Sequence, residues 1–314
     1  MKPPHDPTAA TPGTPDDAGA AGSPEAGVAA GASLSHGATG PVLEVRGLRY
    51  RYPGAATDAL GGLDLAVESA EFVAVVGANG SGKSTLARLL GGLETPARAT
   101  LAMACGHDLL TDEGRTAARR EVGVLFQNPE NQLVAECVED DIAFGLENLA
   151  WSPERMRARV DEMLARFGLT DLRDREPHLL SGGQKQRTAL AGVLAVPRRV
   201  LVLDEPTAML DPAGRREVLE AVAALREDGL AIVFVTQEMD EVVGADRVVA
   251  LEGGDAVYAG DVGGLFGDER LVRRLGLGLP AAGDLALELA AVGRPLDPLP
   301  LTLDALVAAL GAPS

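Results

Sequence analysis

The stretch FVAVVGANGSGKST, residues 72–85, constrains the fold of this chain more than any other. A continuous apolar run that ends in glycine is typical of a buried strand, and residues 85–90 then follow a helical pattern. Between them, Gly77, Gly82, Lys83 and Ser84 match G-x-x-x-x-G-K-[ST], in the strand-to-helix context that this motif requires. Glycines let backbone N–H groups curl around an anion, and the helix N-terminus adds its dipole.

The motif predicts a phosphate-binding loop. Lys83 places a positive charge at the β- and γ-phosphates of a nucleotide, and Ser84 ligates Mg²⁺. The alternative is a glycine-rich turn with an incidental lysine, although lysine is rare here: the others are Lys2 and Lys185. The residues predicted to line the nucleotide are Gly77, Asn79, Gly80, Ser81, Gly82, Lys83, Ser84 and Thr85.

A second apolar run, VLVLDE, ends in two acids, Asp204 and Glu205. Alone, such a run is often only a strand that enters a solvated turn. Together with the phosphate-binding loop, it predicts that Asp204 holds the Mg²⁺ shell and that Glu205 polarises a water for attack on the γ-phosphate.

Composition excludes several other classes of protein. The net charge of -18 argues against a nucleic-acid backbone as the partner, because phosphate binding needs clustered positive charge. Cys105 and Cys137 lie far apart, which indicates neither a disulfide framework nor a zinc site. No apolar run approaches the ~20 residues that span a bilayer, and the N-terminus lacks a signal-peptide pattern, so we expect any membrane role to depend on a partner.

The order of elements predicts an α/β fold. Residues 42–52 alternate as a strand, and further strands follow at 63–68, 71–77, 200–205, 231–236 and 247–251, with a helix over 212–226. Strands that alternate with helices indicate a mainly parallel sheet covered on both faces, with the ligand at the carboxyl ends of the strands. A mostly helical segment occupies about 129–195, with Ser152 and Pro153 at the start of one helix and Gly168 after its end.

The string LSGGQKQR, residues 180–187, discriminates best between families. A serine and two glycines that open a helix expose N–H groups and a hydroxyl to an anion, although they also make an ordinary helix cap. Between the phosphate-binding loop and VLVLDE, the full string resembles the signature of ATP-binding cassette (ABC) ATPases. The resemblance spans about residues 42–260. It implies a P-loop NTPase cassette with a mainly parallel core sheet, an antiparallel β subdomain and a helical subdomain.

The resemblance assigns further roles residue by residue. Tyr52 resembles the aromatic residue that stacks on adenine, and Gln127 matches the glutamine that senses Mg²⁺ and the attacking water. Two subunits of this family pack head to tail, so each presents its signature to the ATP of the other. The residues implied to bind nucleotide in trans are Ser181, Gly182, Gly183, Gln184 and Asp211, the last in the loop AMLD (208–211).

One position departs from the family pattern. VTQEMDE has Gln237 where the family carries a histidine, and the last histidine of the chain is His178. Glutamine donates a hydrogen bond to the γ-phosphate but cannot become cationic. We therefore expect slower hydrolysis at the catalytic pair Glu205 and Gln237, or a composite dimer in which another ATPase supplies the better site.

The segment FQNPENQLVAECVEDDIAFGLENL and the C-terminal string LVRRLGLGLPAAGDLALEL are similar to ATPase subunits of energy-coupling factor (ECF) transporters, which import vitamins or cobalt and nickel ions. This resemblance implies the cofactors ATP and Mg²⁺, a second ATPase subunit, a transmembrane coupling subunit, a membrane substrate-binding subunit, and a peripheral place on the cytoplasmic face. An acidic cluster is expected to dock arginines of the coupling subunit. Its members are Glu136, Glu139, Asp140 and Asp141.

The expected domains are a disordered tail (1–40), an ABC ATPase domain (41–263) and a C-terminal extension (264–314) that serves subunit pairing. Three other interpretations stay open. They are an ATPase subunit of another class of ABC transporter, a cassette ATPase that acts on DNA or the ribosome, and a nucleotide-binding partner with little turnover.

Overall fold

A six-stranded sheet forms the centre of the computed structural model, which describes residues 40–311. The strand order is β10-β9-β3-β8-β7-β6; β10 pairs antiparallel with β9, and the other pairings are parallel. The strands are β3 (Phe72–Gly77), β6 (Val122–Leu125), β7 (Val200–Asp204), β8 (Ala231–Val235), β9 (Arg247–Glu252) and β10 (Asp255–Gly260).

Both faces of this sheet are covered, as its unbroken apolar strands predict. Every residue of β3 is buried. Val73 and Val75 belong to the same apolar cluster as Leu86 and Leu89. Ala74 and Val76, on the opposite face, belong to a second apolar cluster with residues of α7 (Met239–Val242). The mainly parallel core sheet is therefore confirmed.

A second sheet is antiparallel, with strand order β2-β1-β4-β5. It consists of β1 (Leu43–Tyr50), β2 (Leu60–Val67), β4 (Leu101–Ala104) and β5 (His107–Asp108). The antiparallel β subdomain implied by the resemblance is thus present, although the sequence had suggested only β1 and β2. The short strands β4, β5 and β6 and the helix α2 (Asp112–Glu121) were not predicted.

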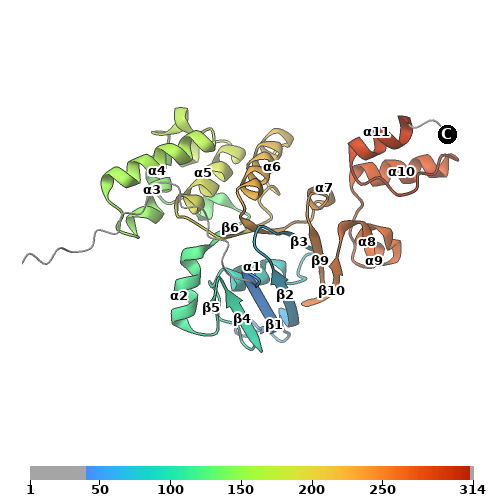
Figure 1. Cartoon of the computed structure of the whole chain (residues 1–314), viewed down its shortest axis with the longest axis horizontal. Helices are drawn as coiled ribbons and strands as arrows, with labels where there is room; N and C mark the ends of the chain where they lie inside the picture. Colours follow the sequence, from blue (N-terminus) through green and yellow to red (C-terminus); the bar gives the residue numbers. More distant parts are fainter. Residues whose placement is uncertain (1–39, 312–314) are drawn as a thin grey trace, which may run out of the picture. The chain divides into compact units, whose positions relative to one another are not determined.

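The helical subdomain contains α3 (Val138–Glu147), α4 (Pro153–Arg166) and α5 (Gly182–Ala195), which contact one another and are grouped together in Figure 1. Three short 3-10 helices accompany them, at Pro129–Asn131, Thr170–Leu172 and Pro177–Leu179. Ser152 caps α4 and Pro153 is its first residue, as predicted. Gly168 follows its end with φ +62°, a conformation that favours glycine.

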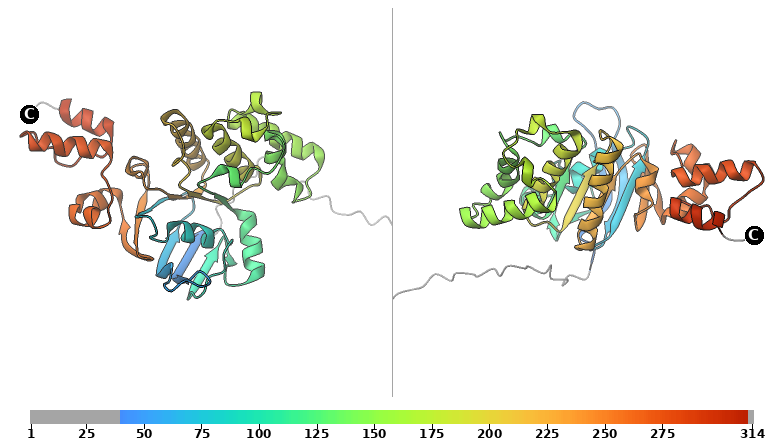
Figure 2. Two further views of the ribbon diagram at one scale, coloured as in Figure 1. Left: turned by 180° about the vertical axis from the view of Figure 1, so that it is seen from behind. Right: turned by 90° about the horizontal axis from the view of Figure 1, so that it is seen from above.

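Two more helices flank the core sheet near the predicted site. These are α1 (Lys83–Leu90), which begins at the phosphate-binding loop, and α6 (Pro212–Glu227), which follows β7. The C-terminal part contains α8 (Val262–Gly267), α9 (Glu269–Arg274), α10 (Ala281–Ala291) and α11 (Leu303–Gly311). The last two contact each other and lie side by side in both views of Figure 2.

Apart from Gly40, the tail predicted for residues 1–40 lies outside the described residues. The domain boundaries at 41–263 and 264–314 stay predictions. Among residues 40–311, no helix is long and apolar enough to cross a membrane.

Candidate active site

The phosphate-binding loop joins β3 to α1, and its glycines adopt conformations that a side chain would prevent. Gly77 has φ +146°, and a Cβ there would lie 2.3 Å from the carbonyl oxygen of Leu251. Gly82 has φ +106°, and its Cβ would lie 2.6 Å from the carbonyl oxygen of Ala59. Backbone on both sides therefore restricts these two positions to glycine.

Lys83 lies inside this curl. Its side chain is buried, and Nζ donates to the carbonyls of Gly77 (2.8 Å) and Ala78 (3.2 Å). Burial lowers the pKa of Lys83, whereas the carboxylates of Glu205, 4.0 Å from Nζ, and Asp204 raise it. The ammonium is thus held within the loop by two backbone carbonyls.

Two oxygen-bearing side chains adjoin at the end of β7. Ser84 Oγ donates to Asp204 Oδ1 at 3.0 Å, and burial raises the pKa of Asp204. A hydroxyl and a carboxylate are hard oxygen donors of the kind Mg²⁺ takes, with water and nucleotide phosphate as its remaining ligands. In the described part of the chain no three His, Cys, Asp or Glu residues form a cluster that could hold a metal ion.

Glu205 lies between two glutamines. Gln127, just beyond β6, donates to Glu205 Oε2 at 2.8 Å, and Gln237, just beyond β8, donates to Oε1 at 2.5 Å. The same amide of Gln237 donates to Asn79 Oδ1 in the phosphate-binding loop at 2.8 Å. Residues from four separate segments therefore converge at the carboxyl edge of the sheet, as the fold predicts.

The backbone of Glu205 is unusual, with φ +49°. A positive φ is uncommon for any residue other than glycine and persists only where the surroundings hold it. The Glu205 N–H donates to the carbonyl of Val235 on the neighbouring strand β8 at 2.9 Å. The strained turn directs the carboxylate toward Gln127 and Gln237.

Tyr52 is linked to the phosphate-binding loop through Thr85, since the two hydroxyls lie 3.1 Å apart. Its ring meets Tyr50 edge to face, with centroids 4.9 Å apart. Tyr50 is buried and donates to Glu94 at 2.8 Å, and burial raises its pKa to about 12. The half-buried ring of Tyr52 is therefore positioned beside the loop.

The signature residues lie apart from this cluster, against α6. Ser181 caps α5 and forms a capping box with Gln184, and Asp211 caps α6 through the N–H of Gly214. A depression is lined by Ser181, Gly182, Gly183, Met209, Asp211, Ala213, Gly214 and Glu217. Four of the five predicted in-trans residues thus line one depression, which includes no residue of the phosphate-binding loop, and the fifth, Gln184, is bound to Ser181 at its rim.

The acidic cluster needs a correction at Asp141. This residue is buried, and its Oδ1 accepts from the N–H groups of Val134 (2.8 Å) and Ala135 (3.0 Å). The prediction that it belongs to an exposed rim is wrong, because its carboxylate shapes the loop before α3. Glu139 is bound to Arg173, while Glu136 and Asp140 are exposed.

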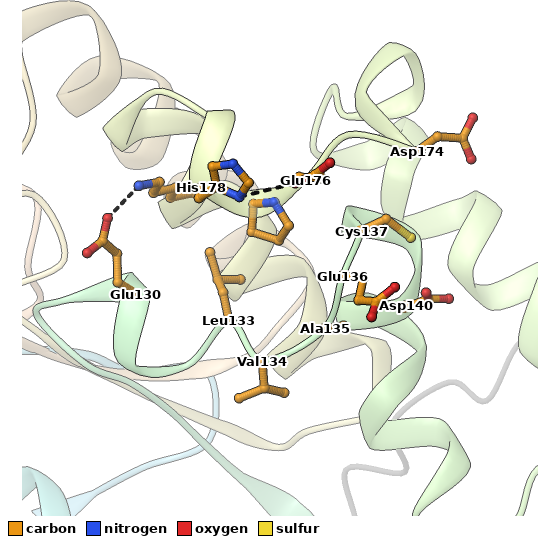
Figure 3. A pocket seen from close by; sticks show the side chains of 12 residues that line it. Glu130, Leu133, Val134, Ala135, Glu136, Cys137, Asp140, Asp174, Glu176 and His178 are labelled. Atoms are coloured by element: carbon orange, nitrogen blue, oxygen red, sulfur yellow. Dashed lines mark hydrogen bonds and ion pairs between the residues drawn. The ribbon is translucent and has the colours of Figure 1, made fainter.

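A groove opens beside this loop, and Figure 3 shows the side chains that line it. Five acids line it, against Lys185 and His178; Lys185 is paired with Glu130, and His178 with Glu176. The lining is Glu130, Leu133, Val134, Ala135, Glu136, Cys137, Asp140, Asp174, Glu176, Pro177, His178 and Lys185. The groove is therefore predominantly acidic.

Comparison with known proteins gives the family. The model of the ABC transporter family matches residues 60–208. A protein of Symbiobacterium thermophilum, named energy-coupling factor transporter ATP-binding protein EcfA1, is 48% identical over 280 residues, which cover 87% of this chain and 97% of the relative. This chain belongs to the ABC transporter family, among the ATP-binding proteins of energy-coupling factor transporters. As a member of this family, it is an ATPase.

Two solved structures agree with this membership. The first is cbiO1 from Clostridium perfringens, described as part of the ABC transporter complex cbiONQ; it is 34% identical, with a TM-score of 0.67, over 79% of this chain and 99% of that one. The second is an ATP-binding cassette solved as a dimer in a post-hydrolysis state with ADP and phosphate. It is 26% identical, with a TM-score of 0.64, over 70% of this chain and 98% of that one.

Sequence reasoning missed several residues around this site. Thr207 and Thr236 follow the ends of β7 and β8, and both donate to the buried Glu241. A signal was available, because Glu241 lies in a short segment with the apolar residues Met239 and Val242, and an acid among buried apolar neighbours needs partners.

Proposed function

We propose that this chain is the ATP-hydrolysing subunit that energises an ECF-type importer of a vitamin or of a cobalt or nickel ion. The observation that carries the proposal is the convergence of Lys83, Gln127 and Gln237 on Glu205 beside the phosphate-binding loop. The likeness to named ECF relatives over most of the chain supports the choice of transporter.

In the proposed reaction, the loop from Gly77 to Thr85 binds the phosphates of ATP and Tyr52 stacks on the adenine. Lys83 exchanges its two carbonyl partners for the β- and γ-phosphates. Ser84, Gln127 and Asp204 would hold Mg²⁺ or its water shell, and the ion would offset charge on the phosphates. Glu205 polarises the attacking water, and Gln237 donates to the γ-phosphate.

A second ATPase subunit completes the site. We propose head-to-tail pairing in which Ser181, Gly182, Gly183, Gln184 and Asp211 of one chain face the ATP bound at Lys83 of its partner. The depression lined by Ser181, Gly182, Gly183 and Asp211, which includes no residue of the phosphate-binding loop of the same chain, supports this arrangement. ATP then favours the closed state of the pair and hydrolysis reopens it.

The acidic groove would receive the transmembrane coupling subunit, which works with a membrane substrate-binding subunit and places this chain at the cytoplasmic face. The exposed acids Glu136 and Asp140 would meet arginines of that subunit. A second candidate is an ATPase subunit of another class of ABC transporter, which the match to the general ABC family model leaves open.

The test is ATP hydrolysis by the purified transporter complex. Wild type is expected to hydrolyse ATP. Glu205→Gln is expected to lower the rate at least ~100-fold while ATP still binds, because it removes the group that polarises water. Lys83→Ala is expected to weaken ATP binding as well. Full hydrolysis by the Glu205→Gln complex would contradict the proposed mechanism.

A further inference from the structure

Glu241 is the acid that the proposed mechanism does not use, although it lies close to the residues that the mechanism needs. It belongs to α7, which begins two residues after Gln237. The residue is 6% exposed, and burial raises its pKa. A buried carboxyl group is costly unless it is fully hydrogen-bonded, so its partners define its role.

The two carboxylate oxygens bind two different segments. Thr207 Oγ1 donates to Oε1 and Thr236 Oγ1 donates to Oε2, both at 2.5 Å. Thr236 Oγ1 also accepts from the N–H of Glu238 at 3.0 Å. Arg215 lies 3.7 Å from Oε1 and supplies the opposing charge. Each carboxylate oxygen of Glu241 thus has a hydrogen-bond donor, and none of the described partners of this carboxylate belongs to the phosphate-binding loop.

Each of these segments carries a residue of the proposed site. Thr207 lies between Glu205, whose backbone has φ +49°, and the loop 208–211, which ends at Asp211. Thr236 directly precedes Gln237. The Glu241 carboxylate therefore links the segment after β7 to the segment after β8. The first segment carries Glu205, the proposed water-polarising acid, and the loop 208–211. The second carries Gln237, the proposed donor to the γ-phosphate.

We propose that Glu241 is a positioning residue that fixes Glu205 and Gln237 relative to each other through its hydrogen bonds to Thr207 and Thr236. Through Thr207 it also couples both residues to the loop 208–211, which meets the partner subunit. The inference rests on the proposed ATPase site. Loss of either hydroxyl should disturb the geometry of hydrolysis and leave ATP binding unchanged, since a misplaced catalytic group lowers kcat rather than affinity.

The experiment compares Thr207→Val with Thr207→Ser in the full-length chain within its purified complex. Valine keeps the shape of threonine without the hydroxyl, whereas serine keeps the hydroxyl. Thr207→Val should lower kcat about tenfold with the Kd for a fluorescent ATP analogue within about twofold of wild type, and Thr207→Ser should stay near the wild-type rate. Equal rates for the two variants, or a Kd that rises as far as kcat falls, would overturn the inference.

A double-mutant cycle with Glu241→Leu tests whether Thr207 acts through Glu241. If it does, adding Thr207→Val to Glu241→Leu should slow hydrolysis no further, and multiplicative losses would overturn the inference. Should Glu241→Leu prevent folding, Thr236→Val against Thr236→Ser replaces it, with the same split expected. If the wild-type complex does not hydrolyse ATP, the proposed function is overturned. If the wild-type complex is active and both valine substitutions leave its rate of hydrolysis unchanged, only the role of Glu241 is overturned.

Discussion

Both oxygens of the Glu205 carboxylate accept hydrogen bonds, one from Gln127 and one from Gln237. Each oxygen keeps a further lone pair, so the carboxylate can accept from water while both amides remain bound. Gln237 already reaches Asn79 in the phosphate-binding loop, so an incoming γ-phosphate would compete directly for its N–H groups.

Gln237→His is expected to raise the steady-state ATPase rate by about tenfold, because an imidazole can carry a positive charge next to the developing negative charge. The variant should also become pH-dependent near the usual histidine pKa of about 6.5, with the added rate lost as the pH rises above it. Steady-state hydrolysis measured from pH 6 to 8 checks this. An unchanged rate across that range would sink the idea that this glutamine slows the enzyme.

Much of the site could be predicted at the level of single residues. The loop at 77–85, Asp204 and Glu205 stand in motifs that indicate their roles, whereas the roles of Gln127 and Gln237 were implied by the resemblance to ABC ATPases. The structure places all of them beside one another. Their functional roles stay predictions. Glu241 could not be found in this way, since its bond to Thr207 joins residues 34 positions apart and depends on the packing of β7 and β8.

At the scale of elements, the N-terminal ends of two helices approach closely at a pair of glycines. Gly183 is the second residue of α5 and Gly214 lies in the first turn of α6; a Cβ added at Gly183 would lie 3.0 Å from the Gly214 Cα. Arg187 and Glu217 add an ion pair between the same helices at 3.2 Å. The signature residues and Asp211 thus lie at the ends of two helices that are in close contact.

Gly214→Ala should force these helix ends apart. Its Cβ would lie 3.3 Å from the Gly183 Cα, and such overpacking costs about 1–3 kcal/mol. We expect a lower ATPase rate with ATP binding to the P-loop retained, measured by hydrolysis and by nucleotide titration. Gly267→Ala is the matched control, because a Cβ there meets nothing within 4 Å. Equal activity of the two variants would show that the close contact is not required.

Three of the elements that sequence reasoning missed are short strands. β4, β5 and β6 have four residues or fewer, too few for alternation to distinguish a strand from a turn. They are strands because they pair with β1, β4 and β7, which only the folded chain reveals. The long buried strands and α4, with its cap at Ser152, were predictable because local pattern and tertiary environment agree there.

At the scale of the whole molecule, the acidic groove is the surface on which the proposed membrane partner depends. Reversing charge with Glu136→Lys and Asp140→Lys should weaken co-purification of the coupling subunit by about tenfold, because attraction to its arginines becomes repulsion. Asp141 is left unchanged, since it supports the fold. Glu113→Lys with Glu227→Lys makes the same charge change at exposed sites outside the groove. If both pairs retain the partner equally, the groove does not dock it.

The central claim is that this ATPase drives an ECF transporter, and the partners that it binds in its own host test that claim most directly. The tagged full-length chain would be purified from gently solubilised membranes, and co-purifying proteins identified by mass spectrometry. We predict a second ATPase subunit or a second copy of this chain, a transmembrane coupling subunit, and small membrane proteins that bind the solute. Recovery of only ribosomal or other non-membrane partners would contradict the account.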